Sequence, residues 1–126
     1  MPKVSKEGAS QVEQHGPVED HAEDLDGGYT VNFVSFAADI DGTPMLKGLP
    51  GDQCHCPHWG YVLKGQVTYR FDDHDEVCVA GDAFYLPPGH IPVIQAGTEL
   101  IQFSPSKELH EVDEAITNNM RQLQGA

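Results

Sequence analysis

The sequence has few basic residues, and this scarcity limits the partners that it can bind. Only 7 Lys and Arg stand against 20 Asp and Glu among the 126 residues, so the net charge is −13 with histidine neutral. A strongly acidic chain repels phosphate backbones and anionic lipid surfaces. We therefore expect neither a nucleic acid nor a membrane as a partner.

Long apolar runs are missing as well. No stretch approaches the length of a membrane span, and the first thirty residues are polar and acidic, unlike a signal peptide. A chain of 126 residues suffices for one hydrophobic core. We expect a single domain in the cytoplasm.

Cysteine is scarce too, and its pattern excludes a disulfide framework. The three cysteines are Cys54, Cys56 and Cys78, an odd number, and a bridge between the first two would close a very tight ring. Reduced thiols are therefore expected, and thiols beside histidines are candidate metal ligands. Cys78 lies between two valines in an apolar segment, so we expect it in the core.

Large apolar residues are nearly absent from residues 1–28, which carry seven acids. Such a segment does not nucleate a core, and we expect a flexible acidic N-terminal arm. The arm contains His15 and His21, whose expected state is a solvated surface histidine, although an arm can also fold over a pocket as a lid.

Residues 29–103 have the pattern of a small β-barrel. About eight short segments rich in β-branched and aromatic residues are separated by Gly, Pro and Asp turns. Among them, His58 to Phe71 alternates well enough for a hairpin around Gly65.

Residues 104–126 change to a helical period. Ser104-Pro105 predicts an N-cap followed by proline at the first helical position. Apolar residues then recur at helical spacing, at Leu109, Val112, Ile116, Met120 and Leu123. We expect one amphipathic helix.

Two motifs resemble those of the cupin family. Tyr61-Val-Leu-Lys-Gly65 resembles the end of the first cupin motif, and Gly81-Asp82 with Leu86-Pro87-Pro88-Gly89 resembles the second. The resemblance is close over the middle third of the chain. It implies an all-β fold, a double-stranded β-helix (jelly-roll or cupin barrel), here followed by a C-terminal α-helix.

The metal ligands that the resemblance implies are altered in this sequence. The family's glutamate position is His58, and its His-x-His pair falls on Asp52 and Cys54. The histidine of the second motif falls on Pro92, and the nearest imidazole is two residues earlier, at His90. A two-residue shift along a strand keeps the same face, so His90 is still expected to point into the barrel.

The candidate metal ligands are therefore His58, His90, Cys56 and Cys54. Both cysteines share a face with His58 if the segment is extended, and Gly60 beside His58 leaves space for a ligand. Thiolate and imidazole donors suit a divalent transition metal such as zinc, iron, copper or nickel. His55 in a loop geometry, or Asp52, remains an alternative to one cysteine, and each cysteine alone is equally explained as a core residue.

Two functions remain open from the sequence. Three protein donors would leave an open position on the ion, as in a metal-dependent enzyme acting on a small organic molecule, with dioxygenase-like or isomerase-like chemistry among those that the resemblance implies. Four donors would instead close a tetrahedral site, as in a non-catalytic small-molecule binding or sensing protein. A homodimer is expected in either case, because a small sheet leaves an edge strand and an amphipathic helix that need cover.

Overall fold

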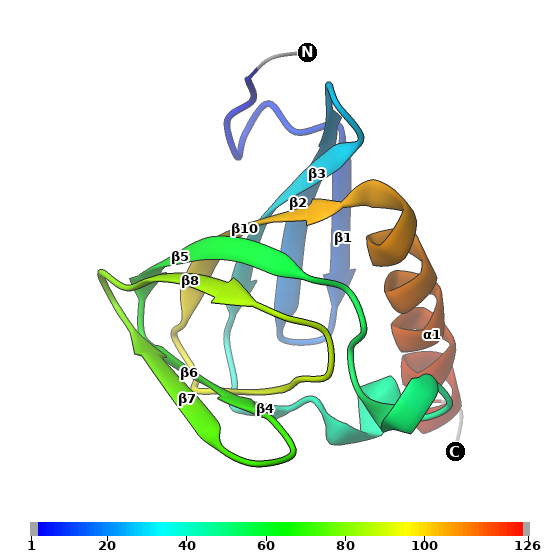
Figure 1. Cartoon of the computed structure of the whole chain (residues 1–126). Coiled ribbons are helices and arrows are strands. Elements are labelled where there is room, and N and C mark those ends of the chain that lie inside the picture. Colours follow the sequence, from blue (N-terminus) through cyan, green and yellow to red (C-terminus); the bar gives the residue numbers. More distant parts are fainter. Residues whose placement is uncertain (1–2, 125–126) are drawn as a thin grey trace.

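The computed structural model describes residues 3–124, which form two antiparallel sheets and one long helix beside them (Figure 1). The larger sheet contains, in spatial order, β1 (Gln11–His15), β2 (Val18–Leu25), β3 (Tyr29–Phe36), β10 (Glu99–Pro105), β5 (His58–Lys64) and β8 (Ala83–Leu86). The smaller sheet contains β4 (Ile40–Asp41), β9 (Ile91–Ile94), β6 (Gln66–Arg70) and β7 (Asp75–Val79). Two short 3-10 helices, η1 (Thr43–Leu46) and η2 (Pro50–Asp52), precede β5, and α1 (Ser106–Gln124) ends the described chain. The expected jelly-roll arrangement with a C-terminal helix is confirmed.

The main core lies between the two sheets, because alternate residues of each strand point inward. On β5, for example, His58 and Val62 are buried while Trp59 and Tyr61 are exposed. The cluster of buried residues between the sheets comprises Val34, Val62, Val67, Tyr69, Cys78, Leu86, Ile94 and Leu100. Cys78 is thus a core residue, as expected.

A second apolar cluster joins α1 to the segment before β5. Leu109 and Val112 of α1 pack with Leu46, Cys54 and Cys56. The helix begins later than the sequence predicts, because Pro105 is the last residue of β10, where it pairs with Tyr29. The helix therefore starts at Ser106. Its apolar face covers the open end of the two sheets.

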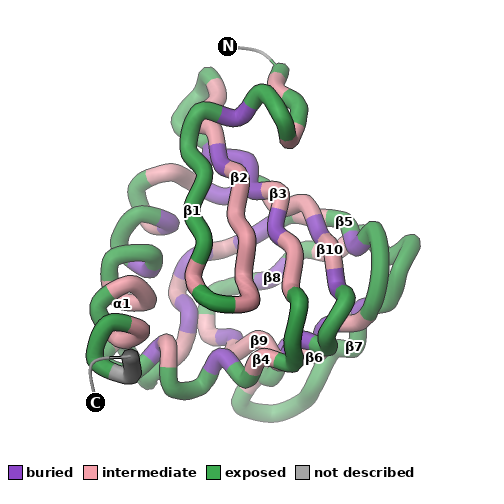
Figure 2. Tube along the Cα trace, turned by 180° about the vertical axis from the view of Figure 1, so that it is seen from behind, coloured by how far each residue is buried: buried purple, intermediate pink, exposed green. Residues whose placement is uncertain are grey.

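The structure differs from the expected flexible arm at residues 11–25. These residues form β1 and β2, and β2 pairs with β3 along its whole length, from Val18 opposite Phe36 to Leu25 opposite Tyr29. Seen from behind, β1 is exposed and β2 is partly covered (Figure 2). Strands pair through hydrogen bonds between backbone N–H and C=O groups, so an acidic segment with few apolar residues can still form them.

Candidate metal centre

His58 is the first residue of β5 and points into the barrel. Only 6% of its surface is exposed. Its Nδ1 lies 2.6 Å from the hydroxyl of Ser104 on the neighbouring strand β10. This contact fixes the ring so that Nε2 faces inward, as a hydrogen bond to the other ring nitrogen does in metal-binding histidines.

His90 and Cys54 are held together by a short backbone bridge. The Cys54 amide donates to the His90 carbonyl at 2.9 Å, and the Gly89 amide donates to the Cys54 carbonyl at 2.8 Å. Gly89 has a φ of 97°, a conformation that favours glycine. The Nδ1–H of His90 donates to the Pro87 carbonyl at 2.9 Å, which leaves the lone pair of Nε2 free for a ligand.

The three side chains converge. Cys54 Sγ lies 3.5 Å from His58 Nε2, and the two imidazole rings have centroids 5.2 Å apart. One donor atom from each of Cys54, His58 and His90 lies within 4.8 Å of the others, and all three residues are buried. Within residues 3–124, no other group of His, Cys, Asp or Glu side chains brings three such atoms together.

Comparison with known proteins agrees with this architecture. Residues 57–111 match the family described as the AraC-like ligand binding domain. None of the curated proteins matches the chain. An RmlC-like cupin from Shewanella frigidimarina NCIMB 400 superposes with a TM-score of 0.57 at 20% identity, covering 81% of this chain and 88% of that one.

Two further structures are similar at lower identity. KdgF from Halomonas sp. gives a TM-score of 0.58 at 17% identity over 83% of this chain and 93% of its own. The polyketide cyclase RemF from Streptomyces resistomycificus gives 0.57 at 14% identity over 84% and 80%. This chain has the cupin fold.

Cys56 lies outside the cluster of three donors. Its thiol is fully buried, contacts the Pro57 carbonyl at 3.4 Å and belongs to the apolar cluster beneath α1. Cys54 and Cys56 would share a face only in an extended strand, whereas the chain between η2 and β5 is irregular. The structure therefore brings together three of the four predicted ligands.

The two alternative ligands also lie elsewhere. His55 Nε2 is 3.1 Å from Glu111 on α1. Asp52 is the last residue of the exposed 3-10 helix η2 and accepts a hydrogen bond from the Gly48 amide at 2.9 Å. In this arrangement neither side chain replaces Cys54 in the cluster of donors.

Burial sets the protonation states of the three donors. It lowers the pKa of His58 to about 3, with a smaller contribution from His90, and it lowers the pKa of His90 as well. Burial raises the pKa of the Cys54 thiol to about 11. The imidazoles are therefore neutral, as metal ligands must be, and a divalent ion would displace the thiol proton on binding.

A cavity of about 180 Å³ opens beside the donors. Its walls are mostly apolar and come from both sheets and from α1, including Tyr69, Leu100 and Val112. The space that the sequence suggested beside Gly60 is not part of it, because the Phe84 ring packs against Gly60 there. The cavity lies instead between the barrel interior and the helix.

Two residues at the centre were missed by sequence reasoning. The sequence predicts Ser104 as a helix N-cap, yet it is the sixth residue of β10 and faces His58. Alternation along β10, with Leu100 inward and Phe103 outward, would have placed Ser104 inward. Tyr69 lines the cavity and its ring meets that of His90 edge-on at 5.9 Å.

Proposed function

We propose that this cupin binds one divalent transition metal ion through Cys54, His58 and His90 and acts on a small organic molecule in the adjoining cavity. The observation that supports this most directly is the convergence of three buried donor atoms at the wall of that cavity. One thiolate and two imidazoles suit zinc, iron, copper or nickel. Such an ion, with a coordination position open to the cavity, would polarise a bound oxygen or acidify a water.

The protein's own contribution is orientation and exclusion of water. Ser104 and the Pro87 carbonyl hold the two imidazoles in fixed positions. The apolar walls would orient the body of the substrate and strengthen polar interactions at the donors, because a dry site has a low dielectric constant. Burial raises the pKa of Tyr69, so its phenol stays protonated and can donate a hydrogen bond to a substrate oxygen.

A metal count tests the binding part of the proposal. Purified wild-type protein is expected to hold about one ion per chain, and His58→Ala and Cys54→Ala are expected to lose it. Cys78→Ala is the matched control, because Cys78 is a buried thiol of the main core outside the donor cluster. Equal metal content in the wild type and His58→Ala would contradict the proposal.

A non-catalytic binding or sensing role is the second candidate. It is favoured by the match of residues 57–111 to a ligand-binding domain family. Cobalt substitution distinguishes the two, because a coordinated water indicates an open, catalytic position, whereas four protein donors and no water indicate a closed site.

We also propose that the cupin works as a homodimer in a reducing compartment such as the cytoplasm. The three cysteines are free, and a thiolate ligand needs such an environment. Among the described residues 3–124, no helix is long and apolar enough to cross a membrane. The dimer is supported by an exposed aromatic surface on the larger sheet, considered below.

A further inference from the structure

The same cavity is bounded by acidic side chains that the proposed reaction does not use. Glu13 on β1, Asp20 on β2 and Asp113 on α1 all line it, so the β1–β2 hairpin and the helix together form a carboxylate-rich end. Within residues 3–124, no lysine or arginine forms an ion pair with any of the three. The basic groups that act on them are histidines, His15 on β1, His21 on β2 and His110 on α1.

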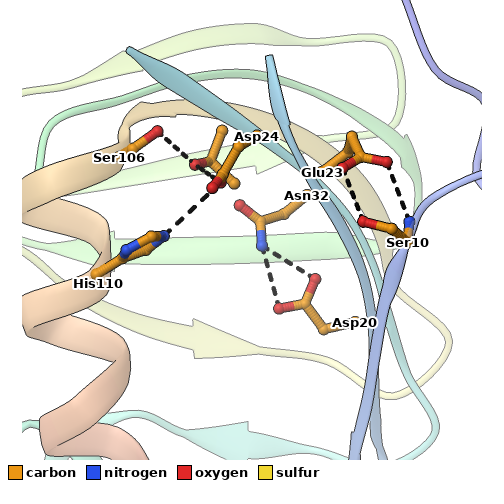
Figure 3. A network of polar contacts seen from close by, with 8 residues as sticks. Ser10, Asp20, Glu23, Asp24, Asn32, Ser106 and His110 are labelled. Atoms are coloured by element: carbon orange, nitrogen blue, oxygen red, sulfur yellow. Dashed lines mark hydrogen bonds and ion pairs between the residues drawn. The ribbon is translucent and has the colours of Figure 1, made fainter. Parts of the chain in front are cut away.

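Asp20 is the most enclosed of these acids. Burial raises its pKa, and Glu13 adds to the shift. Its two carboxylate oxygens accept hydrogen bonds from Nδ2 of Asn32 at 3.0 and 3.1 Å (Figure 3). A carboxylate in such a position is costly without a cation, since one amide does not replace the water that burial removes.

Asn32 provides an independent sign of a missing partner. Its side chain is 2% exposed, and its Oδ1 has no hydrogen-bond partner. Exchanging the two ends of the amide would only leave the nitrogen unpartnered instead. Figure 3 shows this amide projecting from β3 toward α1, into the space between the sheet and the helix.

The group that fits is an organic cation rather than a metal ion. A divalent metal needs its ligand atoms within a few ångströms of one another, and no triplet of these acids meets that condition in the described part of the chain. An ammonium group has several N–H donors that reach separate acceptors at hydrogen-bond distance. The half-buried carboxylate of Asp20, the carboxylate of Asp113 and the unpartnered carbonyl oxygen of Asn32 are such acceptors.

We propose that the acidic end of the cavity binds the ammonium group of a small amine, with Asp20, Asp113 and Asn32 as acceptors. The apolar side chains of Val112, Ile116 and Met120, which line the cavity from α1, would contact its hydrocarbon part. This inference rests on the proposed function in one respect, that the amine occupies the cavity next to the metal donors. It specifies the substrate or ligand class as cationic at one end and apolar along its body.

Asp113 lies at the rim of the cavity, where its carboxylate would contact the bound ammonium group. Its side chain reaches solvent, yet the surrounding protein and the carboxylates of Asp20 and Glu13 raise its pKa to about 7. A bound ammonium would relieve this repulsion. The site therefore prefers a cation to a neutral or anionic group of the same shape.

Calorimetric titration of metal-free protein with n-hexylamine and 1-hexanol tests the proposal. At about pH 8 the amine is protonated. It is expected to bind at least about tenfold more tightly than the alcohol, because hydrogen bonds between charged groups contribute more binding free energy than neutral ones. Asp113→Asn and Asp20→Asn should remove most of this preference. Glu114→Gln is the matched control, because Glu114 is an exposed acid on the same helix outside the cavity.

Three results would overturn the proposal: equal affinity for the two compounds, an unchanged preference in Asp113→Asn, or an equal loss in Glu114→Gln. Asp113 is at the exposed rim, so its variant is informative even if Asp20→Asn does not fold. The metal content of the same variants separates the two proposals. A variant that loses the amine preference but keeps its metal tests the acidic end alone. Absence of metal from the wild type would contradict the proposed metal centre and leave the amine test unaffected.

Discussion

The hydroxyl of Ser104 holds His58 in position. It is fully buried and lies 2.6 Å from Nδ1 of that ring. Ser104→Ala should lower metal affinity about 10- to 100-fold, because the imidazole loses the partner that fixes its orientation. Competition with a chromophoric chelator measures this affinity.

Thr98→Val is the matched control for Ser104→Ala. Thr98 is also fully buried, and its hydroxyl bonds only to the backbone of Gln66, away from the donors. Its replacement should reduce stability without changing the affinity for metal. If both variants bind metal as the wild type does, Ser104 has no part in positioning His58.

Asp113 is expected to make stability depend on pH in a predictable direction. Its pKa in the folded protein is about 7, raised from an ordinary value of 3.8. Between these values the folded state binds more protons at Asp113 than the unfolded state does, so its contribution falls as pH rises. The free energy of unfolding of Asp113→Asn, minus that of the wild type, should therefore increase from about pH 4 to about pH 7.

Urea unfolding at a series of pH values measures this difference. Asp20 acts in the same direction, and the lowered pKa values of His58 and His90 act in the opposite one, but these groups are common to both proteins. A flat difference for Asp113→Asn would show that its carboxyl titrates normally.

At the scale of elements, strands with a strong local pattern could be predicted from the sequence. The hairpin of β5 and β6 was predicted because apolar and polar residues alternate on either side of Gly65, whose φ of 81° needs a glycine. His58 was placed inward by the same alternation. His90 was placed inward by its relation to the second cupin motif, and the structure brings the two rings together.

The features that were missed leave no trace in the alternation of apolar and polar residues. β1 and β2 have few apolar residues, and they form because the backbone of β3 is available to pair with β2. Cys54 and Cys56 diverge because they lie in a loop, where strand alternation does not apply. The space beside Gly60 is filled by Phe84, the residue opposite it on β8, and an added Cβ would also meet the Ile101 carbonyl oxygen at 2.5 Å. Such contacts are set by tertiary packing and not by local pattern.

The whole molecule has one surface that contrasts with its acidic character. The outer face of β3, β10, β5 and β8 exposes aromatic side chains, each between 41% and 53% accessible, namely Tyr29, Trp59, Tyr61, Tyr85 and Phe103. At 150–250 Å² for each whole side chain, they expose roughly 400 Å², about half of the area that one partner of a stable dimer buries. Two chains of charge −13 repel each other. A second copy would therefore bind most favourably through this aromatic surface, whose side chains carry no charge.

The proposed homodimer should therefore associate through this face, and salt should strengthen the association. Added salt screens the repulsion between two acidic chains and leaves the apolar contact intact, whereas an interface of ion pairs would weaken. Tyr61→Lys should weaken dimerisation by about tenfold or more, because it would bury a charge without a partner. Sedimentation equilibrium at micromolar concentrations measures both effects.

Val77→Lys on β7 is the matched control, since Val77 is 55% exposed on the other sheet and its replacement should leave the dimer unchanged. A monomeric wild type, or an equal effect of the two lysine variants, would exclude this face as the interface.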